Sequence, residues 1–342
     1  GMVNRPIRER PVGEELDALR SGLDQTGYEE ISLLSLSSSD HSNIIPLIEG
    51  LRSLLNEREV NISLPSLRIE SFSEELMDEL QTLTPGGGFT LAPEAGTERL
   101  RNIINKPLSD EDLMATVRSV FQHGWKTIKL YFMIGHPQET LEDVAAIAEL
   151  AKAVLQEGRR IAGGRARLHL GISTFIPKPH TPFQWAAFDD LDSIREKLAL
   201  LHEGLHGSKI KMTWNDPEAS LAEAWLSRGD RRMAEVIYQA WKNGARFDAW
   251  SEHFNIHHWR SAFATLGLDP DFYSKRTRAA DEILPWDHIN AGVRKPFLLR
   301  DYEWSKEGKI RPDCRDQCYA CGILSTFSEI RPSHPDGGWK CP

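Results

Sequence analysis

An alternation of strand-like and helix-like segments between residues 28 and 210 is the feature that most constrains the fold of this chain. Short apolar runs rich in β-branched residues recur, and an amphipathic stretch follows each of them. The strand-like runs span 29–37, 60–67, 87–93, 127–135 and 166–176. The helix-like stretches span 43–58, 73–83, 109–123, 140–157 and 189–206. This pattern predicts an α/β fold with a parallel sheet, either open or closed as a barrel.

The pattern changes near residue 211. Residues 217–267 are rich in tryptophan and have a helical pattern, whereas residues 268–342 contain many Pro, Asp and Gly residues. Such residues favour turns and loops. We therefore predict a barrel-like unit over residues 1–210 and a smaller unit over 211–342, helical at first and then irregular.

Charge and cysteine content narrow the class of protein. The formal net charge is −9, which disfavours broad electrostatic binding to nucleic acid, although a local basic groove stays possible. No apolar run is long enough to span a membrane, so no membrane partner is expected.

Four cysteines in 342 residues are too few for a disulfide scaffold. The composition predicts a cytoplasmic protein. Because the first residue is Gly1, we expect either an added residue before Met2 or a piece of a longer chain.

Polar residues and turn formers follow several of the predicted strands. Arg68 comes after the second strand, Glu94 and Thr97 after the third, and Gly135 and Pro137 after the fourth. In parallel sheets the working residues lie on the loops after the carboxyl ends of the strands. Each residue alone is explained as a turn, a helix cap or a surface side chain. Their succession at strand ends predicts a ligand site.

Several longer motifs resemble one enzyme family. "LYFMIGHPQETLEDV" (130–144) resembles a turn of radical S-adenosylmethionine (radical SAM) enzymes of the methylthiotransferase-like branch. "FIPKPHTPFQW" (175–185) and "LAPEAGTERLRNIINK" (91–106) resemble two other loops of that branch. "LSRGDRR", "LPWDHINAGV" and "DCRDQCYACG" resemble the C-terminal part of uncharacterised bacterial radical SAM proteins that carry a B12-binding domain. The resemblance implies a partial (β/α)6 barrel that lacks its first strand.

The resemblance also implies a mechanism and its cofactors. A [4Fe–4S] cluster would bind S-adenosylmethionine and cleave it reductively, and the 5′-deoxyadenosyl radical would abstract hydrogen from a substrate that the sequence does not identify. A flavodoxin or ferredoxin would supply the electron. The S-adenosylmethionine site would include Ser37, Ser38, Arg68, Glu94, Thr97, Gly135 and Pro137. Among these, Arg68 would pair with the ligand's carboxylate, Glu94 would accept from its amino group or ribose, and Gly135 and Pro137 would approach the adenine.

The chain departs from the family in the position of its cysteines. In the family, a C-x3-C-x2-C motif after the first barrel strand holds the catalytic cluster, but this sequence has no such motif near its start. The resemblance implies that the motif and any cobalamin-binding domain lie upstream of Gly1. The chain would then be the major fragment of the enzyme, not competent on its own.

Cys314, Cys318 and Cys321 have that same spacing near the other end of the chain. Four interpretations compete. They are a second iron–sulfur site, a zinc site, the catalytic cluster of a permuted protein, and three thiols without metal. Cys341 or His334 would be the fourth ligand of a metal. The resemblance favours an auxiliary metal site, and the spacing does not separate iron from zinc.

Three functions therefore stand at this point. The first is the major part of a radical SAM enzyme. The second is a non-catalytic metal-binding barrel that serves as a binding or scaffold module. The third is a zinc-dependent enzyme of unknown chemistry. The sequence shows no clear nucleic-acid-binding surface, and it does not give the oligomeric state.

Overall fold

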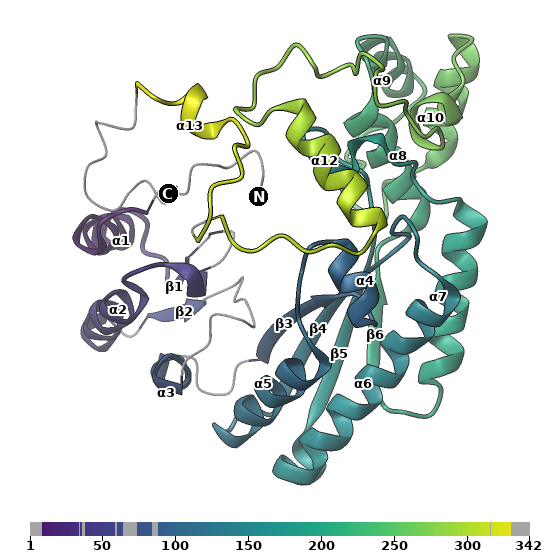
Figure 1. Ribbon diagram of the computed structural model, residues 1–342. Coiled ribbons are helices and arrows are strands. Elements are labelled where there is room, and N and C mark those ends of the chain that lie inside the picture. The colour runs from purple at the N-terminus through teal and green to yellow at the C-terminus, as the bar shows by residue number, and fades with distance from the viewer. Residues whose placement is uncertain are drawn as a thin grey trace.

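The structure is a computed structural model that describes residues 9–33, 35, 38–58, 60–63, 74–83, 88–314 and 316–329. Two parallel sheets organise it (Figure 1). The smaller pairs β1 (Glu30–Ser32) with β2 (Asn61–Ser63). The larger has the strand order β3-β4-β5-β6, and its strands are β3 (Gly88–Glu94), β4 (Thr127–Ile134), β5 (Arg167–Thr174) and β6 (Lys211–Trp214).

Helices connect the parallel strands, because a parallel pair needs a crossover. Around the first sheet lie α1 (Val12–Thr26), η2 (Ser38–Asp40), α2 (Ile44–Arg58) and α3 (Glu74–Leu83). The second sheet is accompanied by α4 (Glu98–Ile103), α5 (Asp110–Gln122), α6 (Leu141–Ala162), η4 (Gly163–Arg165), η5 (Pro182–Trp185) and α7 (Leu191–Leu205). Two of these helices begin with side-chain caps: Ser109 caps α5, and Thr140 with Asp143 forms a capping box on α6.

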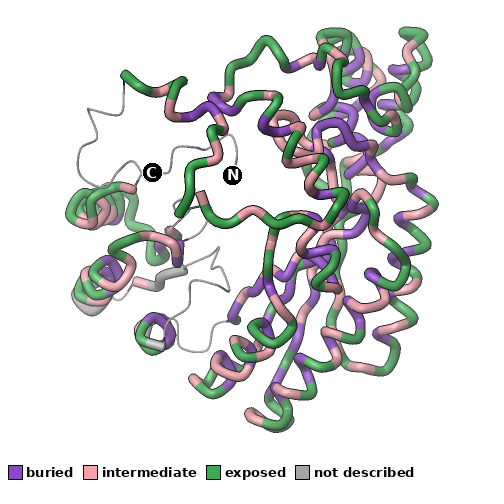
Figure 2. Tube along the Cα trace, in the orientation of Figure 1, coloured by how far each residue is buried: buried purple, intermediate pink, exposed green. Residues whose placement is uncertain are grey.

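The two faces of the larger sheet differ. On one face, packed by α5, α6 and α7, the side chains are almost fully buried (Figures 1 and 2). These residues are Phe89, Leu91, Ile128, Leu130, Phe132, Ile134, Leu168, Leu170 and Ile172. The alternate positions on the other face are half-buried or exposed, and they include Thr90, Lys129, Tyr131, Arg167, His169, Lys211 and Thr213. The sheet is therefore covered on one face and open on the other.

The C-terminal part of the chain packs against the carboxyl end of the larger sheet. Its helices are α8 (Pro217–Arg228), α9 (Met233–Lys242), α10 (Ile256–Thr265), α11 (Pro270–Ser274), α12 (Lys295–Lys306) and α13 (Ile323–Thr326). Trp286 donates a 2.7 Å hydrogen bond to Gln184 in η5. The buried Arg228 guanidinium donates to the backbone carbonyls of Tyr273 and Pro177. These bonds join segments that are distant in sequence at the carboxyl end of the sheet.

The predicted α/β class is confirmed: the sheet is parallel, helices back it, and it does not close into a complete barrel. Strands β3, β4 and β5 match their predicted runs within two residues. The sequence interpretation missed α1, α4 and β6, and β6 begins at the predicted unit boundary, so the sheet continues beyond residue 210. Within the described ranges, no helix has the length and apolar character needed to cross a membrane.

Candidate functional site at the carboxyl edge of the sheet

The carboxyl ends of β3 and β4 lie side by side because the two strands are parallel neighbours. Glu94 ends β3 with a φ of 71°, a left-handed conformation that residues with a Cβ adopt rarely. Lys106 supports it, because the Lys106 Nζ lies 3.3 Å from the Glu94 Oε1 and also donates to the Ala92 carbonyl. The Glu94 side chain is 26% exposed, so its carboxylate stays accessible. Backbone strain of this kind is concentrated at functional sites.

A buried carboxylate locks the loop after β3 to the start of α6. Thr97 caps α4 and donates a 2.5 Å hydrogen bond to Asp143, and Arg99 pairs with the same carboxylate. Arg99 also donates to the Gln138 carbonyl at 3.0 Å. Burial alone would raise the pKa of Asp143, but hydrogen bonds from Thr97, Thr140 and Arg99 lower it below its ordinary value. The loops after β3 and β4 are thus held as one unit.

The turn after β4 is held by a buried ion-pair network. Gly135 has a φ of 86°, which favours glycine, and its N–H donates to the Glu139 Oε2 at 2.7 Å. The Lys197 Nζ from α7 lies 2.7 Å from both Glu139 and Asp189. Burial raises the pKa of Glu139; burial would lower that of Lys197, but the two carboxylates raise it. Lys197 therefore stays charged, and it holds the turn through Glu139, which accepts the hydrogen bond from Gly135.

His136 follows Gly135 in this turn and is only 4% exposed. Its ring packs against Phe175, with 4.7 Å between the ring centroids. Among the described residues, neither ring nitrogen has a hydrogen-bond partner of normal geometry. Burial lowers the pKa of His136 to about 4; the Glu94 carbonyl favours the charged ring, and the positive charge of Lys197 opposes it. The imidazole is therefore neutral at pH 7, with unused hydrogen-bonding capacity.

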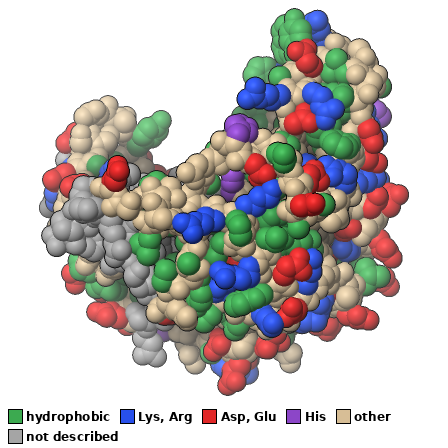
Figure 3. All heavy atoms as spheres, turned by 45° about the horizontal axis from the view of Figure 1, so that its top comes forward, with side chains coloured by type: hydrophobic (Ala, Val, Ile, Leu, Met, Phe, Trp, Pro, Cys, Tyr) green, Lys and Arg blue, Asp and Glu red, His purple; other side chains and the backbone are tan. Residues whose placement is uncertain are grey.

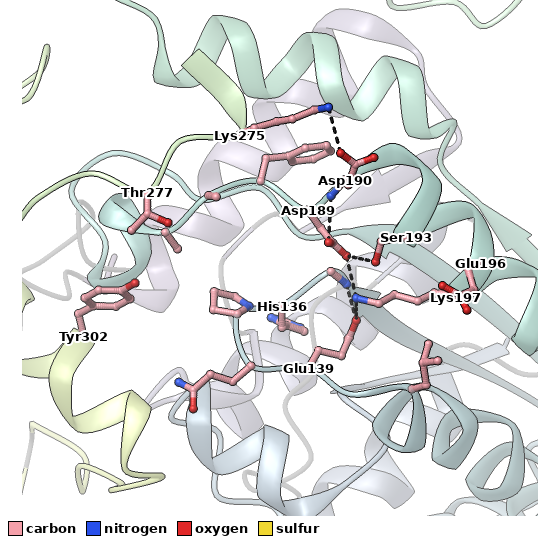
Figure 4. A pocket seen from close by; sticks show the side chains of 17 residues that line it. His136, Glu139, Asp189, Asp190, Ser193, Glu196, Lys197, Lys275, Thr277 and Tyr302 are labelled. Carbon is pink, nitrogen blue, oxygen red and sulfur yellow. Dashed lines mark hydrogen bonds and ion pairs between the residues drawn. The ribbon is translucent and has the colours of Figure 1, made fainter. Parts of the chain in front are cut away.

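A cavity of about 620 Å³ opens beside this turn (Figure 4). Figure 4 shows Glu139, Lys197 and Asp189 joined to one another at one wall with His136 nearby, and Tyr302 of α12 lies at the far side of the cavity. The other lining residues include Pro137, Leu141, Phe188, Asp190, Ser193, Glu196, Lys275 and Thr277. The walls are mainly polar, and their carboxylates are partly neutralised by lysines. The cavity suits a small polar molecule rather than an apolar one.

Four of the predicted site residues meet at this edge of the sheet. Glu94, Thr97, Gly135 and Pro137 all lie on the two joined loops. The hydroxyl of Thr97 is already engaged by Asp143 and by the cap of α4. The Glu94 carboxylate is partly exposed, whereas the Gly135 N–H is bonded to Glu139 and Asp189 packs against Gly135, so the predicted ligand roles of both residues stay predictions.

The remaining predicted ligand-binding residues lie near the first sheet. Ser38 is buried in η2, after β1, with its hydroxyl 3.1 Å from that of Ser35. Ser37 and Arg68 lie outside the residues that the structure describes. Their roles stay predictions.

Three of the cysteines lie close together near the C-terminal end of the chain. Cys318 is exposed, Cys314 and Cys321 are half-buried, and all three are free thiols. Among the described residues, no three His, Cys, Asp or Glu side chains gather closely enough to hold a metal ion. Cys341 and His334 lie outside the described residues, so the predicted four-ligand site stays a prediction.

Our sequence interpretation missed His136, Asp189 and Lys197. One signal for Lys197 was present, because it follows Leu191 and Ile194 at the spacing of the apolar stripe of α7. A lysine on such a stripe indicates a buried partner. His136 had no comparable signal, since its burial depends on Phe175 from another strand end.

Comparison with known proteins bears directly on this edge. Residues 2–151 match the family model of the radical SAM superfamily, and this range contains Glu94, Thr97, Gly135 and Pro137. An uncharacterised protein of Methanocaldococcus jannaschii is 29% identical over 232 residues, which cover 68% of this chain and 48% of that relative. The chain thus spans about half the length of the curated relative that it matches. Residues 2–151 are thus similar to the radical SAM superfamily.

Proposed function

We propose that this protein is a radical SAM-type enzyme that binds S-adenosylmethionine at the carboxyl edge of β3 and β4. The observation that carries the proposal is the superfamily match over residues 2–151, which ends just beyond the turn that Gly135 opens. Glu94 and Gly135 lie together on that edge, in conformations that the surrounding contacts hold. The substrate is not part of the proposal.

The roles of the residues follow from their chemistry. The Glu94 carboxylate accepts hydrogen bonds from the amino group or the ribose hydroxyls of the ligand. The backbone at Gly135 and Pro137 approaches the adenine, and Ser38, together with Ser37 and Arg68, binds the amino acid end. When bound and reduced by one electron, S-adenosylmethionine supplies carbon-radical chemistry. A flavodoxin-like or ferredoxin-like protein is the proposed electron donor.

The metal chemistry is a separate part of the proposal. The described residues do not fit an iron–sulfur cluster, and we derive no step through one. The spacing of Cys314, Cys318 and Cys321, with Cys341, supports a separate iron–sulfur or zinc site. We also propose the methylthiotransferase-like branch and a cytoplasmic location, and cobalamin only through a further domain.

A scaffold function is the second candidate. It is a non-catalytic metal-binding barrel, and the observation that favours it is that the cysteines of this sequence lie near its end and not at the place where the family holds its catalytic cluster. On this alternative the carboxyl edge binds a ligand without radical chemistry. The two functions differ in whether S-adenosylmethionine is bound at all.

The test measures binding of labelled S-adenosylmethionine by equilibrium dialysis, with protein reconstituted anaerobically with iron and sulfide. We expect Glu94→Gln to weaken binding by about tenfold, because a hydrogen bond to a charged group contributes about 1.5–3 kcal/mol. Glu111→Gln is the matched control, since Glu111 lies exposed in the first turn of α5. Protein that holds iron and sulfide but binds no S-adenosylmethionine would overturn the proposal and favour the scaffold.

A further inference from the structure

The open face of the larger sheet carries a row of basic side chains. Lys129 on β4 is the register partner of His169 on β5, and His169 is the partner of Lys211 on β6. Thr90 on β3 is the partner of Lys129 and continues the row. Register partners on neighbouring strands point to the same face of a sheet. The row therefore crosses all four strands, below the carboxyl edge.

The basic side chains of this row have no acidic partner among the described residues. Lys129 and Lys211 are exposed, and Arg167 adds a third exposed cation one row below. Glu94, at the end of β3, lies beyond a register shift that pairs it with Phe132 of the covered face, and Lys106 already neutralises it. Burial lowers the pKa of His169, and Lys211, Lys129 and Arg167 lower it further. The local electrostatic field on this face is therefore positive.

Such a field is an exception in this chain. The formal net charge is −9. Over the face shown in Figure 3, acidic and basic side chains are intermixed among the residues drawn in colour. Two lysines on either side of an imidazole, with no acidic side chain paired to them among the described residues, are most stable when an anion binds between them. Adjacent strands lie about 4.8 Å apart, so long lysine side chains two strands apart can reach one anion.

An exposed aromatic ring lies next to the row. Tyr131 is two residues beyond Lys129 on β4, on the same face, and is 45% exposed. Its side chain leans over Gly171, since a Cβ on Gly171 would lie 2.6 Å from the Tyr131 Cε1 and 2.7 Å from the Cδ1. The ring thus lies across the sheet instead of standing away from it. An exposed ring beside cations is suited to stack on a base.

We propose that the open face of the sheet binds a nucleotide, with its phosphates on Lys129, His169 and Lys211 and its base against Tyr131. The net charge of −9 disfavours a long polyanion, whereas one nucleotide needs only this row and one ring. The nucleotide would be the substrate of the enzyme proposed above. Only its role as a substrate rests on that proposed function. Nucleotide binding itself needs neither a cluster nor S-adenosylmethionine.

The test titrates ADP and inorganic pyrophosphate into the 342-residue protein by calorimetry at low ionic strength. The double variant Lys129→Gln/Lys211→Gln should weaken the binding of both probes by about tenfold or more. The matched control is Lys152→Gln/Lys306→Gln, which removes the same charge from exposed sites on α6 and α12. The control should bind both probes as the parent protein does.

Tyr131→Leu distinguishes the contribution of the base to binding from that of the phosphates. It should weaken ADP binding by about fivefold or more and leave pyrophosphate binding unchanged, because stacking on an aromatic ring contributes about 1–3 kcal/mol. Equal binding in the two double variants would overturn the inference. So would a parent protein that binds no ADP at millimolar concentration, or one that prefers a ten-nucleotide strand to ADP. If the protein gave any of these results but still bound S-adenosylmethionine, the nucleotide-binding inference would be wrong and the proposed function would stand.

Discussion

The two faces of the larger sheet carry residues from the same strands but differ in what covers them. Leu130 and Phe132 on β4 are buried beneath helices, whereas Lys129 and Tyr131, their neighbours in sequence, are exposed. Lys197, beside the covered face, is held between two carboxylates. Lys129 on the open face has no such pair among the described residues. The difference indicates that a charge near the covered face supports the fold, while a charge on the open face is available to a ligand.

The largest effect is expected from Lys197→Met. This change leaves the buried carboxylate of Glu139, whose side chain is 1% exposed, without its cation. Breaking a buried ion pair in this way costs about 3–5 kcal/mol. We expect the free energy of unfolding, measured by urea denaturation, to fall by that amount.

Lys129→Met is the matched change on the open face. Its free energy of unfolding should stay within about 0.5 kcal/mol of the parent protein, as for most surface substitutions. If both lysine variants lost stability equally, the distinction between the two faces would be wrong.

Leu130→Ala and Tyr131→Ala test the same contrast with uncharged neighbours. Leu130 is fully buried, so its truncation should cost about 3 kcal/mol through lost burial and the cavity left behind. Tyr131 is half exposed, so Tyr131→Ala should lower the free energy of unfolding by about 1 kcal/mol or less. Thermal and urea unfolding of the two variants would check this, and a larger loss for Tyr131→Ala would mean that the open face is part of the core.

The pH dependence of stability tests the buried imidazole at the carboxyl edge. The folded pKa of His136, about 4, lies below its ordinary value of 6.5, so the unfolded chain binds the proton more readily. The stability from the neutral ring is therefore fully present above pH 6.5 and is lost as the pH falls towards 4. The loss should approach about 3 kcal/mol.

His136→Phe removes this titration and keeps an aromatic ring beside Phe175. The difference in unfolding free energy between pH 7 and pH 4 should become smaller in this variant. His206→Phe, at an exposed position after α7, is the control and should keep the full difference. An unchanged pH dependence in His136→Phe would show that the ring does not titrate as inferred.

A small effect on stability is expected from Gly171→Ala. The added methyl group would meet the Tyr131 ring, which must move because the two atoms would be 2.6 Å apart. Because Tyr131 is half exposed, the cost should be about 1 kcal/mol. A crystal structure of the variant should show the ring displaced from β5. Undisturbed packing of Tyr131 would contradict its inferred position across the sheet.

Much of the fold was predictable where local pattern and tertiary packing agree. The buried residues of β3, β4 and β5 are apolar and mostly β-branched or aromatic, so these strands were recognised from the sequence. β6 was missed because Lys211 and Thr213 face solvent and leave too few apolar residues for a strand pattern. α4 was read as a loop because it is only six residues long.

The site was predictable only in part, because its remaining members depend on packing between distant segments. Glu94 and Gly135 follow strands, and the sequence placed them correctly at strand ends. Asp143 belongs to the capping box of α6, and it also binds Thr97 and Arg99 at the start of α4, a contact that local sequence does not indicate. The basic row on the open face needs the strand register, which local sequence patterns do not provide.

Release of 5′-deoxyadenosine tests the proposed radical SAM function most directly. The gene product at its full native length would be reconstituted with iron and sulfide, its cluster content verified, and then supplied with dithionite and S-adenosylmethionine. We predict that 5′-deoxyadenosine forms only when both reagents are present, and that Glu94→Gln lowers its rate by about tenfold, whereas Glu111→Gln does not. Cluster-loaded protein that releases no 5′-deoxyadenosine would contradict the proposed function.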